Sequence, residues 1–224
     1  MSAEKKIKVY LAGDSTVQSY PEERAPQAGW GQYIAEHFTT KVLFVNRAIG
    51  GRSSKTFVEE GRLAEILAEI GEGDYLFVQM GHNDATPSRP ERYTEPFGSY
   101  KDYLRQYITG AREHGARPVL ITPMGRLHYE DGVFLNDFAD YCTAMKELAE
   151  EQGVPLVDLM TRSLADYAAM GYDEAQRLFM ISVNGTDLTH FTEAGAQRIA
   201  ALLAEGVREL GIPLSEQVPV LQEK

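Results

Sequence analysis

Short apolar stretches rich in β-branched residues alternate along the chain with longer stretches in which apolar residues recur at helical spacing. The short stretches predict strands at Ile7–Ala12, Val42–Asn46, Tyr75–Gln79, Pro118–Thr122 and Val154–Asp158. The longer stretches predict helices at Tyr33–Phe38, Phe57–Glu69, Tyr100–His114, Phe138–Gln152 and about Thr192 to Leu210. The glycines of His114-Gly115 and Gln152-Gly153 indicate helix ends, because glycine readily adopts the left-handed backbone conformation.

Strands that alternate with helices indicate a parallel sheet that is covered by helices on both faces. The expected fold is therefore α/β, with three α/β/α layers, a five-stranded parallel sheet and right-handed crossovers. No linker and no internal repeat interrupts the 224 residues. We therefore expect a single domain over residues 1–224, with its core at about residues 8–210.

The loops that follow the predicted strands carry the polar residues of interest. In an open parallel sheet, ligands bind beyond the carboxyl ends of the strands, so these loops are expected to converge at one edge. They read Gly13-Asp14-Ser15-Thr16, Arg47-Ala48-Ile49-Gly50-Gly51-Arg52-Ser53, Gly81-His82-Asn83-Asp84 and Pro123-Met124-Gly125-Arg126.

Charge and cysteine content narrow the class of protein. The chain has 22 Lys and Arg against 33 Asp and Glu, a formal charge of −11, which argues against broad nucleic-acid binding. The apolar stretches are too short to span a bilayer, and no membrane association is expected. The first apolar run is also too short for a signal peptide, so a cytoplasmic protein is expected unless a leader was removed. The lone Cys142 is expected to be a buried structural thiol, and no His/Cys cluster has the spacing of a metal site.

Three residues have the types and positions required for nucleophilic catalysis. A serine hydroxyl needs a base to accept its proton, and Ser15 at the end of the first strand is the candidate nucleophile. The candidate base is His190, and Asp187 stands three residues before it, where one local turn brings its carboxylate to Nδ1 of the ring. A tetrahedral oxyanion also needs fixed donors. The candidates are the N–H groups of Ser15 and Gly51 and the side-chain amide of Asn83.

These blocks together resemble the SGNH/GDSL hydrolase superfamily, and within it the rhamnogalacturonan acetylesterases. The resemblance rests on Gly13–Thr16, Asn46–Ser53, Gly81–Asp84 and Asp187–Phe191, is supported by Gly29-Trp30-Gly31, and covers roughly Lys8 to Leu210. It implies a flavodoxin-like fold and no cofactor. It also implies Ser15 as the nucleophile, Asp187 and His190 as the rest of the triad, and Gly51 and Asn83 as oxyanion donors, with Gly50 as the alternative to Gly51.

The resulting prediction is a serine esterase that removes O-acetyl groups from a carbohydrate through an acetyl-enzyme. The expected partner is an acetylated oligosaccharide, in the first place one of rhamnogalacturonan (pectin). The nearest alternative is an esterase for another acyl ester, such as acetyl xylan, a cephalosporin-type acetate or a lysophospholipid. Alternatives of another class are an FMN-binding flavodoxin-like module and a non-catalytic sugar-binding module. The oligomeric state stays open.

Three further residues are candidates for substrate contacts: Arg52, Trp30 and His82. Trp30 is expected either in the core or as a wall for sugar stacking, and His82 either supports the oxyanion loop or touches substrate. We hypothesise that Arg52, with one or more neighbouring arginines, binds a uronate carboxylate, since arginine suits bidentate recognition of carboxylates. The alternative is ordinary surface ion pairing. The neighbouring arginines are Arg24, Arg89, Arg92 and Arg126.

Overall fold

A five-stranded parallel sheet forms the centre of the protein. The structure is a computed structural model that describes residues 6–219, so residues 1–5, where the expectation about a leader begins, lie outside it. The sheet has the order β3-β1-β4-β5-β8, and every neighbouring pair is parallel. Its strands are β1 (Ile7–Gly13), β3 (Val42–Asn46), β4 (Tyr75–Gln79), β5 (Arg117–Ile121) and β8 (Leu156–Val157).

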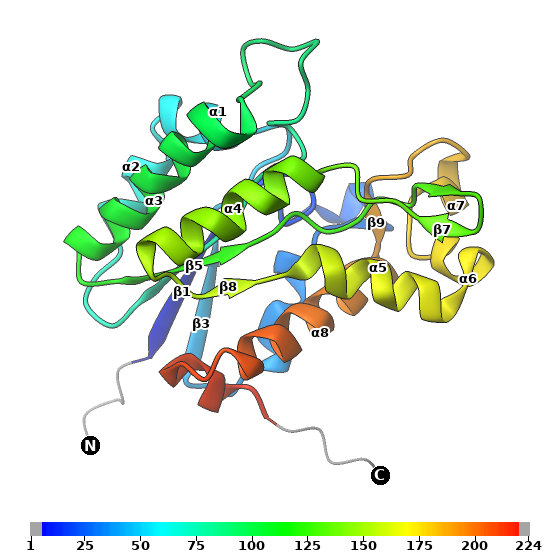
Figure 1. Cartoon of the computed structure of the whole chain (residues 1–224). Helices are drawn as coiled ribbons and strands as arrows, with labels where there is room; N and C mark the ends of the chain where they lie inside the picture. The colour runs from blue at the N-terminus through cyan, green and yellow to red at the C-terminus, as the bar shows by residue number, and fades with distance from the viewer. Residues whose placement is uncertain (1–5, 220–224) are drawn as a thin grey trace.

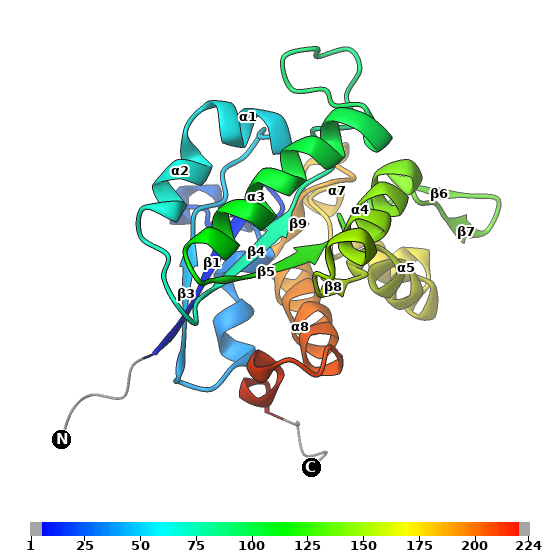
Figure 2. The same cartoon turned by 60° about the vertical axis from the view of Figure 1, so that its left-hand side comes forward.

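Helices cover both faces of this sheet, as Figures 1 and 2 show. One face carries α1 (Ser54–Glu59), α2 (Arg62–Leu67), α3 (Lys101–Glu113) and α4 (Ala139–Gln152). The other carries α5 (Leu159–Met170), α8 (Glu193–Glu209) and the short 3₁₀ turns η2 (Trp30–Gln32) and η3 (Ile34–His37). The predicted three-layer α/β/α fold with its five parallel strands is confirmed.

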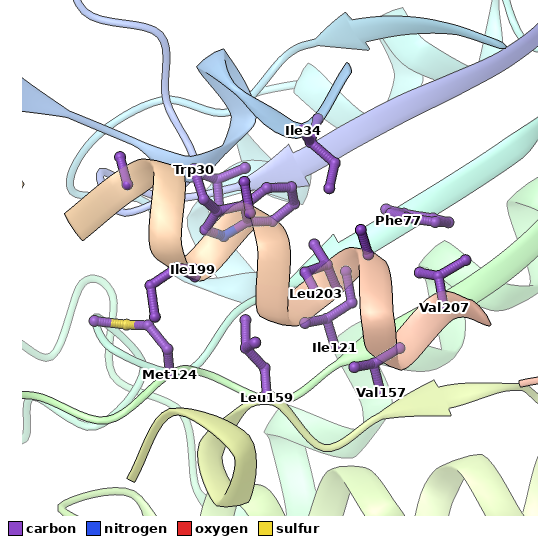
Figure 3. Packing of buried hydrophobic residues seen from close by; sticks show 14 of the residues in the cluster. Trp30, Ile34, Phe77, Ile121, Met124, Val157, Leu159, Ile199, Leu203 and Val207 are labelled. Carbon is purple, nitrogen blue, oxygen red and sulfur yellow. The ribbon is translucent and has the colours of Figure 1, made fainter. Parts of the chain in front are cut away.

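The two cores follow from the alternation of side chains along each strand. In β1, Val9 and Leu11 point into the layer of α8, whereas Tyr10 and Ala12 point into the layer of α1 to α4. Figure 3 shows the first of these cores, in which Ile199, Leu203 and Val207 of α8 pack against strand residues and Trp30. Because both faces are buried, the strands read as continuous apolar runs.

The prediction of one continuous helix at Phe57–Glu69 is wrong. It begins earlier, at Ser54, and is divided into α1 and α2 at Gly61, whose φ of +78° interrupts the helical backbone. The predicted helix at Tyr33–Phe38 is only the 3₁₀ turn η3. The helix ends at Gly115 and Gly153 are confirmed, with φ of +74° and +57°.

The structure also contains several short elements that the pattern of apolar residues did not predict. The antiparallel pair of β2 with β9 matters most, because it joins the segment after β1 to the segment that carries His190. No helix described within residues 6–219 is long and apolar enough to cross a membrane. The elements not yet given are β2 (Gln27–Ala28), β6 (Tyr129–Glu130), β7 (Val133–Phe134), β9 (Phe191–Thr192), α6 (Tyr172–Gln176), α7 (Ile181–Asn184), η1 (Glu22–Arg24), η4 (Pro96–Tyr100) and η5 (Pro213–Gln217).

Candidate active site

Ser15 lies in a tight turn directly after β1. The carbonyl of Asp14 accepts hydrogen bonds from the N–H groups of Val17 and Gln18, which winds the chain back at once. The turn needs glycine before it, because a Cβ at Gly13 would lie 2.5 Å from Cγ2 of Val17. Tyr20 then donates its hydroxyl to the carbonyl of Ser15 over 2.8 Å. These contacts hold the Ser15 hydroxyl at the carboxyl edge of the sheet.

Asp187, His190 and Ser15 form one continuous series of hydrogen-bonding side chains. Nε2 of His190 lies 2.9 Å from Oγ of Ser15, although the residues are 175 positions apart in the chain. Nδ1 of the same ring lies 2.8 Å from Oδ2 of Asp187. The carboxylate accepts at Nδ1, so Nδ1 carries a proton and Nε2 is left to accept the proton of Ser15.

The loop that carries Asp187 and His190 is held from several sides. Oδ1 of Asp187 accepts the N–H groups of Thr189 and His190, so the carboxylate closes its own turn. The N–H of Leu127, after β5, donates to the carbonyl of Leu188 over 2.9 Å. Burial raises the pKa of Asp187. The N–H donors and the His190 ring lower this pKa by more than burial raises it, so the net pKa lies below the ordinary value. Asp187 is therefore ionised at neutral pH.

Two backbone N–H groups near Ser15 are available to an oxyanion. Within residues 6–219, neither the N–H of Ser15 nor that of Gly51 has an acceptor. The N–H of Gly50, by contrast, is already bound to Oε1 of Gln18. This difference favours Gly51 over Gly50 as the donor. Gly51 has a φ of +80°, a conformation in which glycine is strongly preferred.

Asn83 offers the third donor from the loop after β4. It is 9% exposed, and its Nδ2 donates one hydrogen to the carbonyl of Arg52 over 2.9 Å. A side-chain amide has two N–H donors, so the second remains for a ligand. The bond to Arg52 also ties the Asn83 loop to the Gly51 loop. The structure thus joins the three predicted triad residues by hydrogen bonds and ties the Asn83 loop to the loop of Gly50 and Gly51, which approaches Ser15 at Gly50.

Trp30 is placed differently from the predicted sugar-stacking wall. Its ring is 1% exposed and packs in the core beside α8, so it offers no face to a sugar, and its assignment as a substrate contact is wrong. Its Nε1 donates to Gln79, Gln79 donates to Thr16, and Thr16 donates to Asp14. This buried relay ends beside Ser15 and fixes the turn. The sequence pattern missed Gln79 because it reads simply as the last residue of a strand.

His82 and Arg52 are also bound within the protein. His82 is 4% exposed, with Nδ1 3.2 Å from Oδ2 of Asp14 and Nε2 3.2 Å from the carbonyl of Met124. It supports the loops and is not placed to touch substrate. Arg52 binds Glu60 through Nε over 3.0 Å and the carbonyl of Gly50 through Nη1. Its guanidinium is therefore engaged in the ion pairing that was the alternative to carboxylate binding.

Within residues 6–219, no three His, Cys, Asp or Glu side chains gather in a group that could hold a metal ion. Cys142 lies buried in α4, where burial raises the pKa of its thiol to about 12. A thiol in this setting stays protonated and packs as a small apolar side chain.

A buried parallel sheet with a hydrogen-bonded serine, histidine and aspartate at its carboxyl edge has the architecture of a serine hydrolase. Residues 9–203 match the model of the GDSL-like lipase/acylhydrolase family. The chain belongs to this family and is a carboxylic ester hydrolase.

Two relatives from Bacillus subtilis (strain 168) cover nearly the whole chain. One, described as a probable rhamnogalacturonan acetylesterase, is 58% identical over 94% of this chain and 96% of its own length. The other, described as a rhamnogalacturonan acetylesterase, is 42% identical over 96% of this chain and 95% of its own length.

Solved structures share the fold. A crystal structure of a Bacillus subtilis protein matches with a TM-score of 0.84 and 31% identity, over 93% of this chain but only 58% of that longer protein. An acetylxylan esterase from Geobacillus stearothermophilus matches with a TM-score of 0.68 and 16% identity, over 95% of this chain and 98% of that one. At this identity, the second match concerns the fold alone.

Proposed function

We propose that this protein is a serine esterase that removes O-acetyl groups from rhamnogalacturonan oligosaccharides. The observation that carries the proposal is the series Asp187–His190–Ser15, with contacts of 2.8 and 2.9 Å. Support for the substrate class comes from the two Bacillus subtilis relatives, whose descriptions name rhamnogalacturonan. The cytoplasmic location expected from the N-terminal sequence stays a prediction.

The first half of the reaction forms an acetyl-enzyme. Oγ of Ser15 attacks the acetyl carbonyl carbon while Nε2 of His190 accepts the hydroxyl proton. The negative oxygen of the tetrahedral intermediate accepts hydrogen bonds from the N–H groups of Ser15 and Gly51 and from the Asn83 amide. The bond between the acetyl carbon and the sugar oxygen then breaks, and His190 gives its proton to the leaving sugar alkoxide.

The second half releases acetate. A water attacks the acetyl-enzyme, His190 accepts a proton from it, and the same three donors hold the new oxyanion. The bond to Oγ of Ser15 breaks, His190 returns the proton to Ser15, and acetate leaves. Asp187 holds the His190 ring in one orientation and stabilises its positive charge at each step.

The test measures acetate release from acetylated rhamnogalacturonan fragments by wild type, Ser15→Ala and the control Ser19→Ala. Ser19 is an exposed hydroxyl four positions along the chain, and no role in the reaction is assigned to it. We expect Ser15→Ala to lose activity by roughly 10⁴-fold or more while remaining folded, and Ser19→Ala to behave as wild type. A fluorophosphonate probe should label wild type and Ser19→Ala, but not Ser15→Ala. Normal turnover by Ser15→Ala contradicts the proposal.

A panel of nitrophenyl esters separates this proposal from the other acyl esters. Acetyl esters should be hydrolysed far better than butyryl and longer esters, and acetate should leave rhamnogalacturonan faster than xylan. A preference for long acyl chains contradicts an acetylesterase while leaving the role of Ser15 intact.

A further inference from the structure

Two arginines at the carboxyl edge of the sheet have no carboxylate partner among the residues that the structure describes. Arg92 lies in the long connection of residues 80–95 that projects beyond the sheet in Figure 1, and Arg126 follows β5. Both side chains are partly buried. Within residues 6–219, neither makes an ion pair, and the buried Nε–H of each lacks an acceptor. An unsatisfied buried donor of a charged group costs free energy of folding. The two open Nε–H groups therefore call for an explanation.

The contacts that these arginines do make leave the N–H edge of the guanidinium groups available. Arg126 lies over the ring of Phe138, with its guanidinium carbon 4.9 Å from the ring centroid. A guanidinium stacked in this way keeps its donors in its own plane, where they can reach a planar anion. Arg92 makes one long hydrogen bond, from Nη2 to Oγ1 of Thr86 over 3.3 Å.

The two positive charges act on one another. Burial lowers the pKa of Arg92, as do the charges of Arg89 and Arg126, whereas Glu91 and Asp84 act in the opposite direction. The net pKa of Arg92 lies below its ordinary value, with burial as the largest cause, and the charge of Arg126 contributes to the lowering. Arg52 differs in this respect, because it pairs with Glu60, a carboxylate that it shares with Arg62. A bound anion would relieve the repulsion between Arg92 and Arg126.

A chain of contacts connects these arginines with the reacting groups. The Phe138 ring under Arg126 packs edge-to-face on the His82 ring, with their centroids 4.7 Å apart. His82 in turn contacts Asp14, which precedes Ser15 in the chain. Leu127, next to Arg126, holds the carbonyl of Leu188 in the loop of His190. Arg92 lies beyond Asn83 in the same connection after β4. The arginine pair is thus built into the two loops that flank the site.

We propose that Arg92 and Arg126 bind the carboxylate of a uronate residue in the substrate and so select an acidic oligosaccharide. This inference rests on the proposed function, because an acetylated rhamnogalacturonan supplies uronate carboxylates as well as acetyl groups. Arginine forks recognise carboxylates through paired charge-assisted hydrogen bonds. The carboxylate is bound in the same way before and during the reaction, so the pair lowers KM and leaves kcat nearly unchanged.

The experiment compares two substrates that differ only in charge: an acetylated rhamnogalacturonan oligosaccharide and its carboxyl methyl ester. The variants are Arg92→Gln and Arg126→Gln, each paired with the charge-retaining Arg92→Lys or Arg126→Lys in case a glutamine disturbs folding. The control is Arg47→Gln, because Arg47 is a surface arginine already paired with Glu69 over 2.6 Å. Hydrolysis of 4-nitrophenyl acetate reports on the reacting groups independently of sugar binding.

We expect wild type and Arg47→Gln to have kcat/KM at least about tenfold higher on the acid than on its methyl ester, the size of one charge-assisted hydrogen bond. Each glutamine variant should lose most of this preference through KM and keep wild-type activity on 4-nitrophenyl acetate. The lysine variants should retain part of the preference for the acid over its methyl ester. Added salt should reduce this preference in wild type. Equal rates of wild type on both substrates, or equal losses by the variants on both, overturn the inference. If no acetylated sugar is hydrolysed although 4-nitrophenyl acetate is, the proposed function fails instead.

Discussion

The carboxylate of Asp14 and the imidazole of His82 form a buried contact beside the nucleophile, with Oδ2 3.2 Å from Nδ1. The two side chains are at most 3% exposed. The distance suits a hydrogen bond, but the atoms are not well aligned for one, so the contact is mainly electrostatic. Burial raises the pKa of Asp14, yet the electrostatic effect of the neighbouring His82 and the donors of Thr16 lower it below its ordinary value.

Removing both members of this pair should cost less stability than the sum of the costs of removing each one alone. His82→Leu leaves the Asp14 carboxylate buried without its partner, and breaking a buried pair in this way typically costs about 3–5 kcal/mol. Asp14→Asn keeps an acceptor for Thr16 but removes the charge. The double variant should therefore be less destabilised than the sum of the single variants, by at least about 1 kcal/mol. Denaturant unfolding of wild type, the two single variants and the double variant at pH 7 measures this coupling. If the losses of unfolding free energy in the single variants add up to the loss in the double variant, the contact contributes no stability.

Asp187→Asn should reduce kcat severely with little loss of stability. Oδ1 of Asp187 accepts two backbone N–H groups, so the amide oxygen of an asparagine would stay there and turn its NH₂ towards Nδ1 of His190. The ring would then carry its proton on Nε2 and face Ser15 as a donor, the wrong tautomer for a base. We expect a loss of roughly 10⁴-fold in kcat. Steady-state kinetics with 4-nitrophenyl acetate checks this, and a loss below tenfold contradicts the role given to Asp187.

Asn83→Ala should lower kcat by roughly 10²–10³-fold and leave KM nearly unchanged, because an oxyanion donor acts mainly in the transition state. The substitution also removes the bond from Nδ2 to the Arg52 carbonyl, which ties two loops together. Asn83→Asp also removes both hydrogen bonds, because a carboxylate has no donor, and in addition it repels the oxyanion. It should be at least as inactive as Asn83→Ala. A rise in KM with normal kcat in both variants would instead make Asn83 a substrate-binding residue.

The strands and the Asp187–His190 part of the triad were predictable because their signals are local, whereas Ser15 was found from its place at the end of the first strand. Continuous apolar runs mark buried parallel strands, and three residues suffice to close the Asp187 turn onto His190. Gly61 shows where the same reasoning fails, because a helical pattern of apolar residues runs across a glycine that divides the helix in the structure. Apolar spacing reports which face is buried, and it carries no information on backbone continuity.

The assignments that failed depend on contacts between distant segments. Trp30 and His82 carry polar atoms that suit a ligand, but their burial is set by α8 and by Phe138, far along the chain. Arg52 pairs with Glu60 across α1, whereas Arg92 and Arg126 lie in separate loops and make no such pair within residues 6–219. The choice between Gly50 and Gly51 likewise turned on Gln18, whose side chain gives no signal in the sequence.

Asp84 should make the stability of the protein fall as pH rises from about 4 to about 6. It is fully buried, and burial raises its pKa from 3.8 to about 6, although hydrogen bonds from Ser54 and Thr94 partly oppose this. Because the folded chain holds the proton more tightly than the unfolded chain, the stability that Asp84 contributes is fully present below pH 3.8 and is lost as pH rises through about 6. Asp84→Asn cannot titrate, so it should remove this slope.

The free energy of unfolding of wild type relative to Asp84→Asn should therefore drop by roughly 2–3 kcal/mol between pH 4 and pH 7. Denaturant unfolding of both proteins at several pH values measures the difference, in which the other titrating groups cancel. Asp140→Asn serves as the control, because Asp140 is an exposed aspartate in the first turn of α4. The difference in unfolding free energy between wild type and Asp140→Asn should vary much less over the same pH range. A constant difference between wild type and Asp84→Asn would mean that the buried Asp84 carboxyl keeps an ordinary pKa, held there by the donors of Ser54 and Thr94.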